Sequence, residues 1–560
     1  MIKNKIIISK ILEIVDTLIE ASEYLNKVYV EHNYFEFEII FKDMVDSLNA
    51  IYDEILMLKN SENVYKMDIM CENIIYSFNR LKLLYTSRSL RMSEKIEFEV
   101  IPLLIDMKLK LYFFSCIYPN KTKMIDYYSN EMINMCSNKF IDRSEEMQSY
   151  KYDISIIITG YNKLDYTKLC IDSLLKNIPK GLTYELILVN HGSSDGTKEY
   201  FESISPTKQL DICKNGVGLS AVYRIVEGKY VLSVSNDVLI ANNTIQNMIA
   251  CMESDNSIAW VVPSTPNISN LQQIFSDYKS IDEMYNFALQ NNKRDKFRWE
   301  QRAKLCNPID LKRSKVFFSM NGIGWGGYLH TFKNMSFPDD KLSFLLRRNG
   351  YKMMLAKDAY CYHFGSITLK NDISKYVDNN GNKGFNAYYL DGRKEFLEIF
   401  GIDPWGVGFC WEPDLFKYLP CNEINDLNVL GINCGIGSNP LKVKESIKEN
   451  VHNLKVKIYN ITDEHCYIQD LKGVSDIAEY VPSIEDLNSF FSNEKFKYII
   501  IESKFETYEN PLKILDKLKN NIVEDGILAI KIQQKELKDV IKLKFNDVIE
   551  SGQWMILKSF

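Results

Sequence analysis

Two apolar runs, each ending in a polar turn and separated by an amphipathic segment, constrain the fold of this chain most. The first run and its turn span residues 153–162, and the second run and its turn span residues 184–197. A strand, a helix and a second strand in this order predict parallel strands of one sheet. Open parallel sheets bind ligands beyond the carboxyl ends of their strands, where both polar turns fall.

A third apolar run, residues 231–235, is followed directly by Asn236 and Asp237. It predicts another strand and adds a carboxylate to the same edge of the sheet. Magnesium and manganese bind hard oxygen ligands and keep several waters, so one or two side chains suffice to hold the cation on a diphosphate. These features favour an enzyme that acts on a nucleotide sugar.

Composition narrows the class of protein further. With 560 residues and about 150 residues per domain, three or four domains are expected. The net charge of −6 gives no polybasic surface for nucleic acid. The 12 cysteines contain no CxxC pair, which argues against a disulfide framework or a structural zinc site. Neither a signal peptide nor a membrane span is predicted, so we expect a cytoplasmic protein.

Changes in residue periodicity and glycine content divide the chain into several parts, which predicts an α/β multidomain protein. Residues 1–150 contain no glycine and show helical periodicity, for example at residues 11–25 and 41–58, which predicts a helical bundle. Residues 151–402 alternate short β-branched runs with amphipathic segments. Residues 403–426 predict a linker, and residues 427–560 begin a second α/β pattern.

Seven short motifs occur in the order known from inverting glycosyltransferase family two, which the central part of the chain resembles. The motifs are residues 159–162, 189–197, 215–221, 235–237, 321–327, 338–340 and 359–366. The resemblance implies a GT-A, Rossmann-like fold, a nucleotide-sugar donor and a divalent cation, Mn²⁺ or Mg²⁺.

The resemblance assigns the donor contacts to the first polar turns. Thr159 and Tyr161 would lie near the nucleobase and ribose. Asn190 stands where many relatives have an aspartate, with Asp195 close by. An ordinary turn at residues 190–196 remains the alternative, because asparagine, glycine, serine and aspartate all favour turns.

Asn236 and Asp237 resemble the family's DXD-like element with its first acid replaced by Ser235. Asp237 would therefore bind the metal that bridges the diphosphate. Alternatively, Asp237 could cap the segment that begins at residues 242–244, or simply lie in a turn.

Asp339 and Asp340 precede a predicted helix that ends at Gly350. The family motif places the catalytic base on Asp340, with Asp339 as the other candidate. Capping by an acid near a helix start is the structural alternative. Arg347 and Arg348 on the same helix are expected to be solvated or paired.

His363 closes the next predicted strand, and the family's matching loop approaches the diphosphate and can ligate the metal. A satisfied core histidine is the alternative. Glycines in residues 321–327 allow a close backbone approach to a ligand. There, Trp325 would stack on a sugar face or merely pack, and Gly326 lies beside it among the donor contacts.

Residues 429–438 form a strand that feeds a glycine-rich turn, which resembles the first motif of class I S-adenosylmethionine (SAM)-dependent methyltransferases. Two departures leave SAM binding open: the predicted second strand ends in Asn460 instead of an acid, and Asn433 replaces the acid of the first motif. A degenerate, scaffolding or acceptor-recruiting domain is the favoured interpretation.

These features predict a metal-dependent inverting glycosyltransferase. The best donor hypothesis is UDP-N-acetylglucosamine, and the best acceptor hypothesis is a Ser or Thr hydroxyl of a protein such as flagellin. Two alternatives stay open: surface-glycan synthesis with coupled methyl transfer, and a non-catalytic scaffold of a glycosylation complex.

Overall fold

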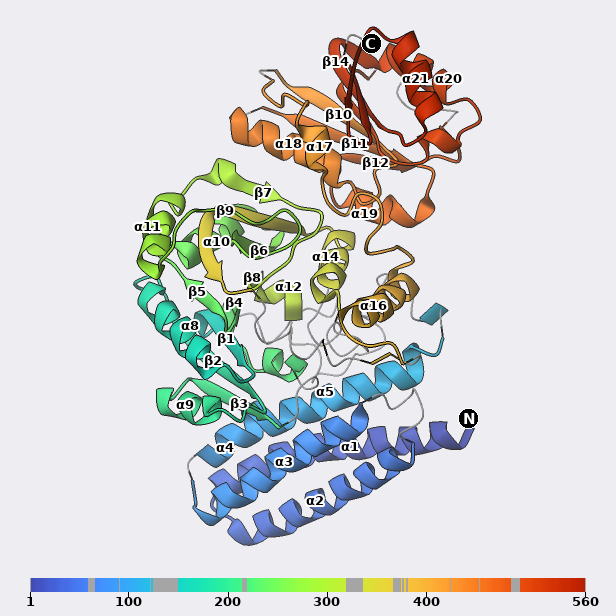
Figure 1. Cartoon of the computed structure of the whole chain (residues 1–560). Coiled ribbons are helices and arrows are strands. Elements are labelled where there is room, and N and C mark those ends of the chain that lie inside the picture. Colours follow the sequence, from blue (N-terminus) through green and yellow to red (C-terminus); the bar gives the residue numbers. More distant parts are fainter. Residues whose placement is uncertain are drawn as a thin grey trace.

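The computed structural model places three packed units along the length of the molecule (Figure 1). A helical unit lies at one end, an α/β unit with a large sheet lies in the middle, and a second α/β unit lies at the other end. The described residues are 2–58, 66–89, 91–120, 122–123, 150–213, 219–318, 336–365, 374, 377–378, 381–423, 425–452, 454–484 and 494–558. Within these ranges, no helix has both the length and the apolar composition to cross a bilayer.

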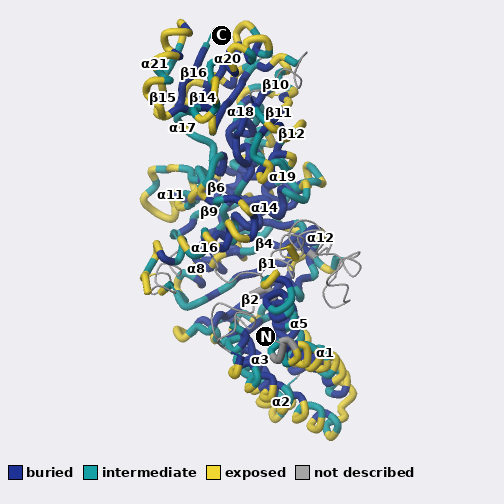
Figure 2. The backbone as a smooth tube through the Cα atoms, turned by 90° about the vertical axis from the view of Figure 1, so that its right-hand side faces the viewer, coloured by how far each residue is buried: buried dark blue, intermediate teal, exposed yellow. Residues whose placement is uncertain are grey.

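The N-terminal unit is helical, as predicted. Apolar residues spaced three and four apart form one buried stripe on each long helix, while the outer faces are exposed (Figure 2). Asn33 caps α2 by accepting a hydrogen bond from the Glu36 amide. The helices are α1 (Ile2–Val30), α2 (Tyr34–Met57), α3 (Met67–Thr86), α4 (Arg91–Lys95) and α5 (Ile101–Tyr112), with a π-helical turn at Ile96–Val100 between the last two.

The central sheet has the strand order β3-β2-β1-β4-β8-β6-β9-β5, and β7 pairs with β9. The predicted parallel arrangement is confirmed for β1, β2 and β4, and β3, which was not predicted, adds a further parallel strand. Beyond β4 the sheet is mixed, because β8 runs antiparallel to both β4 and β6. The strands are β1 (Tyr152–Gly160), β2 (Tyr184–His191), β3 (Lys208–Ile212), β4 (Gly228–Ser235), β5 (Val238–Ile240), β6 (Ile258–Ser264), β7 (Trp299–Gln301), β8 (Ile309–Arg313) and β9 (Lys352–His363).

Amphipathic helices cover this sheet and bury their apolar sides against it. The strands β1, β2, β4 and β6 are buried almost throughout, as expected for a sheet packed on both faces. The helices are α8 (Leu164–Asn177), α9 (Thr197–Ile204), α10 (Thr244–Glu253), α11 (Ile281–Asn291), α12 (Ser314–Phe318), α14 (Pro338–Arg348) and α16 (Phe385–Phe400).

The C-terminal sheet has the order β12-β11-β10-β13-β14-β16-β15, with β10 to β14 parallel and β16 antiparallel to its neighbours. The two strands predicted here from the sequence are present as β10 and β11, but the second of them continues to Thr462, past the predicted end. The strands are β10 (Leu427–Ile432), β11 (Val456–Thr462), β12 (Ile477–Tyr480), β13 (Phe496–Ile501), β14 (Ile522–Lys531), β15 (Asp547–Ser551) and β16 (Trp554–Lys558). The helices are α17 (Pro413–Phe416), α18 (Ser438–Asn450), α19 (Ile468–Lys472), α20 (Pro511–Leu518) and α21 (Lys535–Lys544).

The helical unit packs on β3, the strand at one end of the central sheet's order. Asp211 of β3 pairs with Arg80 of α3, and its Oδ2 lies 3.2 Å from the Lys95 ammonium. The Asp211 amide also donates to Glu99 at 3.0 Å. Although burial opposes it, the two cations lower the pKa of Asp211 to about 2. This contact covers the unpaired edge of the strand with charged groups that satisfy one another.

Candidate functional site

The pairing of the first strands brings the predicted donor residues to one level at the carboxyl edge of the sheet. Thr159 of β1 lies beside Val189 of β2 on one side and beside Ser235 of β4 on the other. Gly160 is next to Asn190. Thr159 and Tyr161 are partly exposed at this edge, so both remain accessible to a ligand.

Asp237 and His363 meet at the same edge. They come from opposite ends of the central unit's sequence, and the antiparallel pairing of β5 with β9 joins them through Val238 and His363. The His363 Nε2 atom lies 3.4 Å from Asp237 Oδ2, and both side chains are nearly buried. The fold therefore brings these two side chains together, as expected from the sequence.

The orientation of His363 follows from its other ring nitrogen. Nδ1 lies 2.8 Å from the carbonyl oxygen of Asn267, which can only accept, so Nδ1 carries the proton of this bond. The side-chain amide of Asn267 donates back to the His363 carbonyl at 2.7 Å. The Nε2 atom therefore points toward the Asp237 carboxylate, so that an imidazole nitrogen and a carboxylate oxygen lie close enough together to contact one cation.

These two groups fit a divalent cation that also has ligands from a diphosphate and from water. Carboxylate oxygen suits both Mg²⁺ and Mn²⁺, whereas an imidazole nitrogen suits Mn²⁺ better. Among the described residues, no group of three or more His, Cys, Asp or Glu side chains converges as a self-sufficient metal site. A cation held by Asp237 and His363 would need its remaining ligands from outside these two side chains.

Asn236 fixes the loop that carries Asp237. Its side-chain amide donates to Thr167 Oγ1 at 2.9 Å and to the Asn162 carbonyl at 3.2 Å, which ties the end of β4 to the turn after β1. Asp237 does not cap the following helix: the N-cap position of α10 is Asn243. The capping alternative for Asp237 is therefore wrong.

The turn after β2 is closed by its own polar side chains. Asn190 Oδ1 accepts from the Ser193 amide at 3.1 Å. Asp195 Oδ2 accepts from the Leu164 amide at 2.9 Å, and its Oδ1 accepts from the Thr197 hydroxyl at 2.6 Å. Although burial opposes it, these hydrogen bonds lower the pKa of Asp195. Asp195 thus joins the starts of α8 and α9 and shapes the turn in which Asn190 lies.

Asp339 and Asp340 lie in the first turn of α14, the helix predicted from the sequence. The N-cap position is Phe337, which makes no side-chain capping bond, so neither acid is the N-cap. The Asp340 carboxylate is 2.7 Å from the ammonium of Lys304. Asp339 is partly exposed, and its Oδ2 accepts from the Asn307 amide at 3.4 Å.

A short path of contacts joins these acids to the edge where Asp237 lies. Strand β8 starts beside the end of β4, with Ile309 next to Val234. The Ser235 amide donates to the Pro308 carbonyl at 2.9 Å, and the preceding residue, Asn307, reaches Asp339. The carboxyl end of β4 and the first turn of α14 therefore lie on the same side of the sheet.

The two neighbouring acids have different electrostatic surroundings. Burial, together with the nearby charges of Asp340 and Asp310, raises the pKa of Asp339 to about 8. Burial opposes the charge of Lys304, yet the Asp340 carboxylate raises the pKa of this lysine. The raised pKa favours the protonated form of Asp339, which directly precedes the Lys304-paired Asp340 in the sequence of α14.

Two predicted site residues, Trp325 and Gly326, lie outside the described residues. The same is true of most of the motif at residues 215–221 and of the loop that follows His363 and Gly365.

The glycine-rich turn of the second α/β unit is covered by its own chain. A Cβ atom on Gly435 would lie 1.8 Å from the Val407 carbonyl oxygen, and a Cβ on Gly408 would lie 2.1 Å from the Cys434 carbonyl oxygen. The Gly408 amide also donates to Glu502 at 3.0 Å. Glycine is needed here because two backbone segments touch, so the pattern that suggested SAM binding has a structural cause.

Asp463, which follows β11, was missed because the predicted strand ended three residues earlier. Its carboxylate accepts from the Tyr508 hydroxyl at 2.9 Å and from the Asn433 amide at 3.2 Å, and it pairs with Lys504 at 3.1 Å. An acid is thus present at this strand end, and it is saturated by neighbouring side chains.

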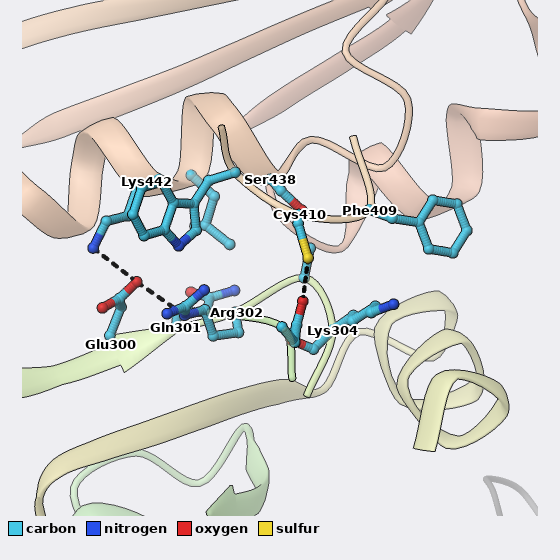
Figure 3. Close-up of a pocket in the computed structure, with 12 residues that line it drawn as sticks. Glu300, Gln301, Arg302, Lys304, Phe409, Cys410, Ser438 and Lys442 are labelled. Carbon is cyan, nitrogen blue, oxygen red and sulfur yellow. Dashed lines mark hydrogen bonds and ion pairs between the residues drawn. The ribbon is translucent and has the colours of Figure 1, made fainter. Parts of the chain in front are cut away.

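A pocket between the two α/β units is lined by residues of both (Figure 3). Glu300 there lies 3.1 Å from the Lys442 ammonium and 2.9 Å from Arg302. Lys304 also lines this pocket while its ammonium contacts Asp340. No sequence signal marked Lys304, because its partner is 36 residues away in the chain.

Residues 155–300 match the family model described as glycosyl transferase family 2. Over 191 residues the chain is 26% identical to an uncharacterized glycosyltransferase of Synechocystis sp.; the match covers 32% of this chain and 59% of that protein. The chain thus spans somewhat over half the length of the curated relative. These similarities support a glycosyltransferase enzyme, and they agree with the family motifs found along the central unit.

Solved structures give weaker likenesses. GalNAc-T7, solved with UDP, GalNAc and Mn²⁺, superposes with a TM-score of 0.30 at 12% identity over 39% of this chain and 44% of its own. The mannosyltransferase PcManGT from Pyrobaculum calidifontis, solved with GDP-Man and Mn²⁺, superposes with a TM-score of 0.28 at 15% identity. The match covers 53% of this chain and 74% of the mannosyltransferase chain. TarS 1-349 of S. aureus superposes with a TM-score of 0.27 at 16% identity, and the match covers 38% of this chain and 60% of the TarS chain.

Proposed function

We propose that this protein is a metal-dependent inverting glycosyltransferase that moves a sugar from a UDP-sugar, N-acetylglucosamine being the first candidate, to a hydroxyl acceptor. The observation that carries the proposal is the convergence at one sheet edge. Asp237 and His363 lie 3.4 Å apart there, and contacts through Pro308 and Asn307 lead from this edge to Asp339 on α14.

Asp340 is the proposed base. The acceptor hydroxyl loses its proton to this carboxylate while its oxygen attacks the anomeric carbon from the face opposite the diphosphate. The bond from that carbon to the diphosphate oxygen breaks and UDP leaves, so the configuration inverts and no covalent sugar–enzyme intermediate forms. Lys304, 2.7 Å away, favours the ionised carboxylate that a base requires. Asp339 is the second candidate for the base. The nearby charge of Asp340 adds to burial in raising the pKa of Asp339.

Asp237 and His363 are the proposed ligands of Mn²⁺ or Mg²⁺. A cation bound there would neutralise charge on the diphosphate leaving group. For the nucleoside we assign Thr159, Tyr161 and Asn190 as contacts.

Asn236 and Asp195 are assigned to shaping the turns around the nucleoside, a role supported by their hydrogen bonds to neighbouring backbone. Trp325 and Gly326 remain assigned to the sugar side on the family resemblance alone.

The proposed acceptor is a Ser or Thr hydroxyl of a protein, with flagellin as the example that the sequence resemblance suggests. The helical unit offers a broad outer face on which Phe35, Met57 and Leu83 are each more than two-thirds exposed. We also propose the division into a helical domain (1–150), a transferase domain (151–402), a linker (403–426) and a C-terminal domain (427–560).

The C-terminal domain is proposed to have a methyltransferase-like fold without a role for SAM. The order of its first five strands, 3-2-1-4-5 in chain numbering, supports a doubly wound, nucleotide-binding type of sheet. The covered glycine-rich turn argues against a cofactor at its switch point.

The experiment is a donor assay on the full chain. UDP or GDP release would be measured from a panel of UDP- and GDP-sugars with Mn²⁺, with and without purified flagellin, beside an Asp237→Ala variant of verified folding. The proposal requires release from a UDP-sugar that depends on Mn²⁺ and is lost in the variant. Release that is equal in both proteins, or no release from any donor, would contradict it.

A further inference from the structure

Two buried charges connect the C-terminal unit to the helix that carries Asp339 and Asp340. Arg347 of α14 is 1% exposed and Asp470 of α19 is fully buried. The guanidinium binds one carboxylate oxygen of Asp470 through two nitrogens, at 2.5 and 3.0 Å. Arg348 binds the other oxygen at 2.8 Å. The two units are therefore joined by a desolvated, geometrically defined ion pair.

Arg347 also holds the chain segment that carries Lys304. Its remaining terminal nitrogen donates to the Ala303 carbonyl, immediately before Lys304. This contact is the first of three along α14. The Leu305 amide donates to Ser343 Oγ at 3.2 Å, and the Asn307 amide donates to Asp339 at 3.4 Å.

The spacing of these contacts shows how the segment lies along α14. On the helix they involve residues 347, 343 and 339, which are four apart and lie on one face. On the facing segment they involve residues 303, 305 and 307, which alternate as in an extended chain. The segment thus runs along α14 from its last turn, at Arg347, to its first turn, at Asp339.

Lys304 lies within this segment and pairs with Asp340 at 2.7 Å. Its position relative to Asp340 depends on how the segment is anchored on α14. At the Arg347 end, the anchor includes a carboxylate from another part of the chain. Close packing reinforces it: a Cβ atom on Gly473, three residues after Asp470, would lie 2.4 Å from Arg347 Cγ.

We infer that Asp470 is a positioning residue of the transferase, which acts through Arg347 to hold Lys304 and the Asp339–Asp340 pair in register. The C-terminal unit is then a structural part of the catalytic apparatus. The closure of its glycine-rich turn by Val407 and Gly408 fits this role, since that turn makes contacts within the chain. The inference rests on the proposed function for its catalytic consequence.

The test uses the full chain and three variants: Asp470→Asn, Arg347→Lys and Asp516→Asn. Asp470→Asn keeps the shape of the side chain and removes its charge. Arg347→Lys keeps a cation for Asp470, so that no charge is left unpaired. Its single ammonium group lacks the separate guanidinium nitrogens that bind both Asp470 and the Ala303 carbonyl. Asp516→Asn is the matched control, because its partner Lys544 is a surface residue of the same unit.

Two readouts separate positioning from general damage. The first is kcat and KM for UDP release from UDP-N-acetylglucosamine with Mn²⁺; if this donor is not used, the active donor of the panel replaces it. For both interface variants we expect kcat to fall about 10- to 100-fold with the donor KM within about twofold, since misplacement by about 1 Å has effects of this size. The second is amide hydrogen exchange of residues 301–310 and 336–349, which needs no activity and should accelerate in both variants but not in the control.

Unchanged exchange in those segments, or faster exchange with an unchanged kcat, overturns the inference. If Asp470→Asn does not fold, Arg347→Lys decides by the same criteria. If the unaltered protein releases no nucleotide from any donor, the proposed function fails, and the catalytic role of Asp470 fails with it. The exchange data then still decide whether Asp470 anchors the segment on α14.

Discussion

The imidazole of His363 and the carboxylate of Asp237 face each other at 3.4 Å although 126 residues of chain separate them. We expect His363→Ala to raise the Mn²⁺ concentration needed for half-maximal UDP release about 10- to 100-fold, because one ligand is lost. Asp237→Ala should lower the maximal rate about 100-fold or more, as for loss of a transition-state stabiliser. His32→Asn, in an exposed turn of the helical unit, is the control. Equal Mn²⁺ dependence in all variants would contradict the assignment.

Replacement of Asp340 by Asn should abolish the proposed base while preserving its shape. The rate of sugar transfer should fall about 100- to 10,000-fold. Binding of UDP, measured by calorimetry with Mn²⁺, should stay unchanged because Asp340 is not assigned to the donor. A variant with weakened UDP binding and an unchanged rate at saturating donor would instead place Asp340 among the donor contacts.

Lys304→Gln should alter the pH dependence of transfer. Removing the cation 2.7 Å from Asp340 takes away a charge that favours the ionised carboxylate. The rate at pH 7 should fall, and raising the pH should restore part of it. Lys417→Gln, which breaks a mostly exposed pair with Asp414, is the control. A rate reduced equally at every pH would indicate a purely structural role for Lys304.

Asp339 should make the protein less stable as the pH rises. Its folded pKa is about 8, against about 4 for an unfolded chain, so between these values the folded state binds more protons than the unfolded state. The free energy of unfolding contributed by this group therefore declines from pH 4 to pH 8 and stays low above. Urea unfolding at pH 5, 7 and 9 should show a smaller decline in Asp339→Asn. An identical decline in both proteins would exclude Asp339 as its source.

The glycine-rich turn of the C-terminal unit supplies a test of packing. Gly435→Ala should lower Tm more than Gly181→Ala does. Both positions have positive φ, which costs about 1–2 kcal/mol for an alanine, but only at Gly435 does a Cβ meet backbone, 1.8 Å from the Val407 oxygen.

Addition of SAM at millimolar concentration should leave Tm of the unaltered protein unchanged. Stabilisation by SAM would show that the turn opens to a ligand.

Local pattern was enough to predict much of the architecture. The helices of the first unit, the parallel strands β1, β2 and β4, the helix after Pro338 and the strands β10 and β11 all follow from periodicity, apolar runs and turn residues. The antiparallel placement of β8 was not predicted. Strand direction depends on which neighbour a segment pairs with, and residues 309–313 carry no local signal for that choice.

The candidate site divides in the same way. Asp237, Asp339, Asp340 and His363 were recognisable because each lies at the end of a strand or the start of a helix with a family motif around it. Lys304, Asn267 and Asp470 were not, since each acts through a partner distant in sequence.

The sequence by itself determined where many strands and helices form and that Asp237, Asp339 and Asp340 stand at their ends, because these features depend on side chains within a few residues of one another. Only the tertiary structure decided that Lys304 pairs with Asp340 and that Asp470 reaches Arg347. It also decided that the second glycine-rich turn is filled by the chain itself. Those outcomes depend on burial and close packing between distant segments, where each buried charge must find a partner and each gap must be filled.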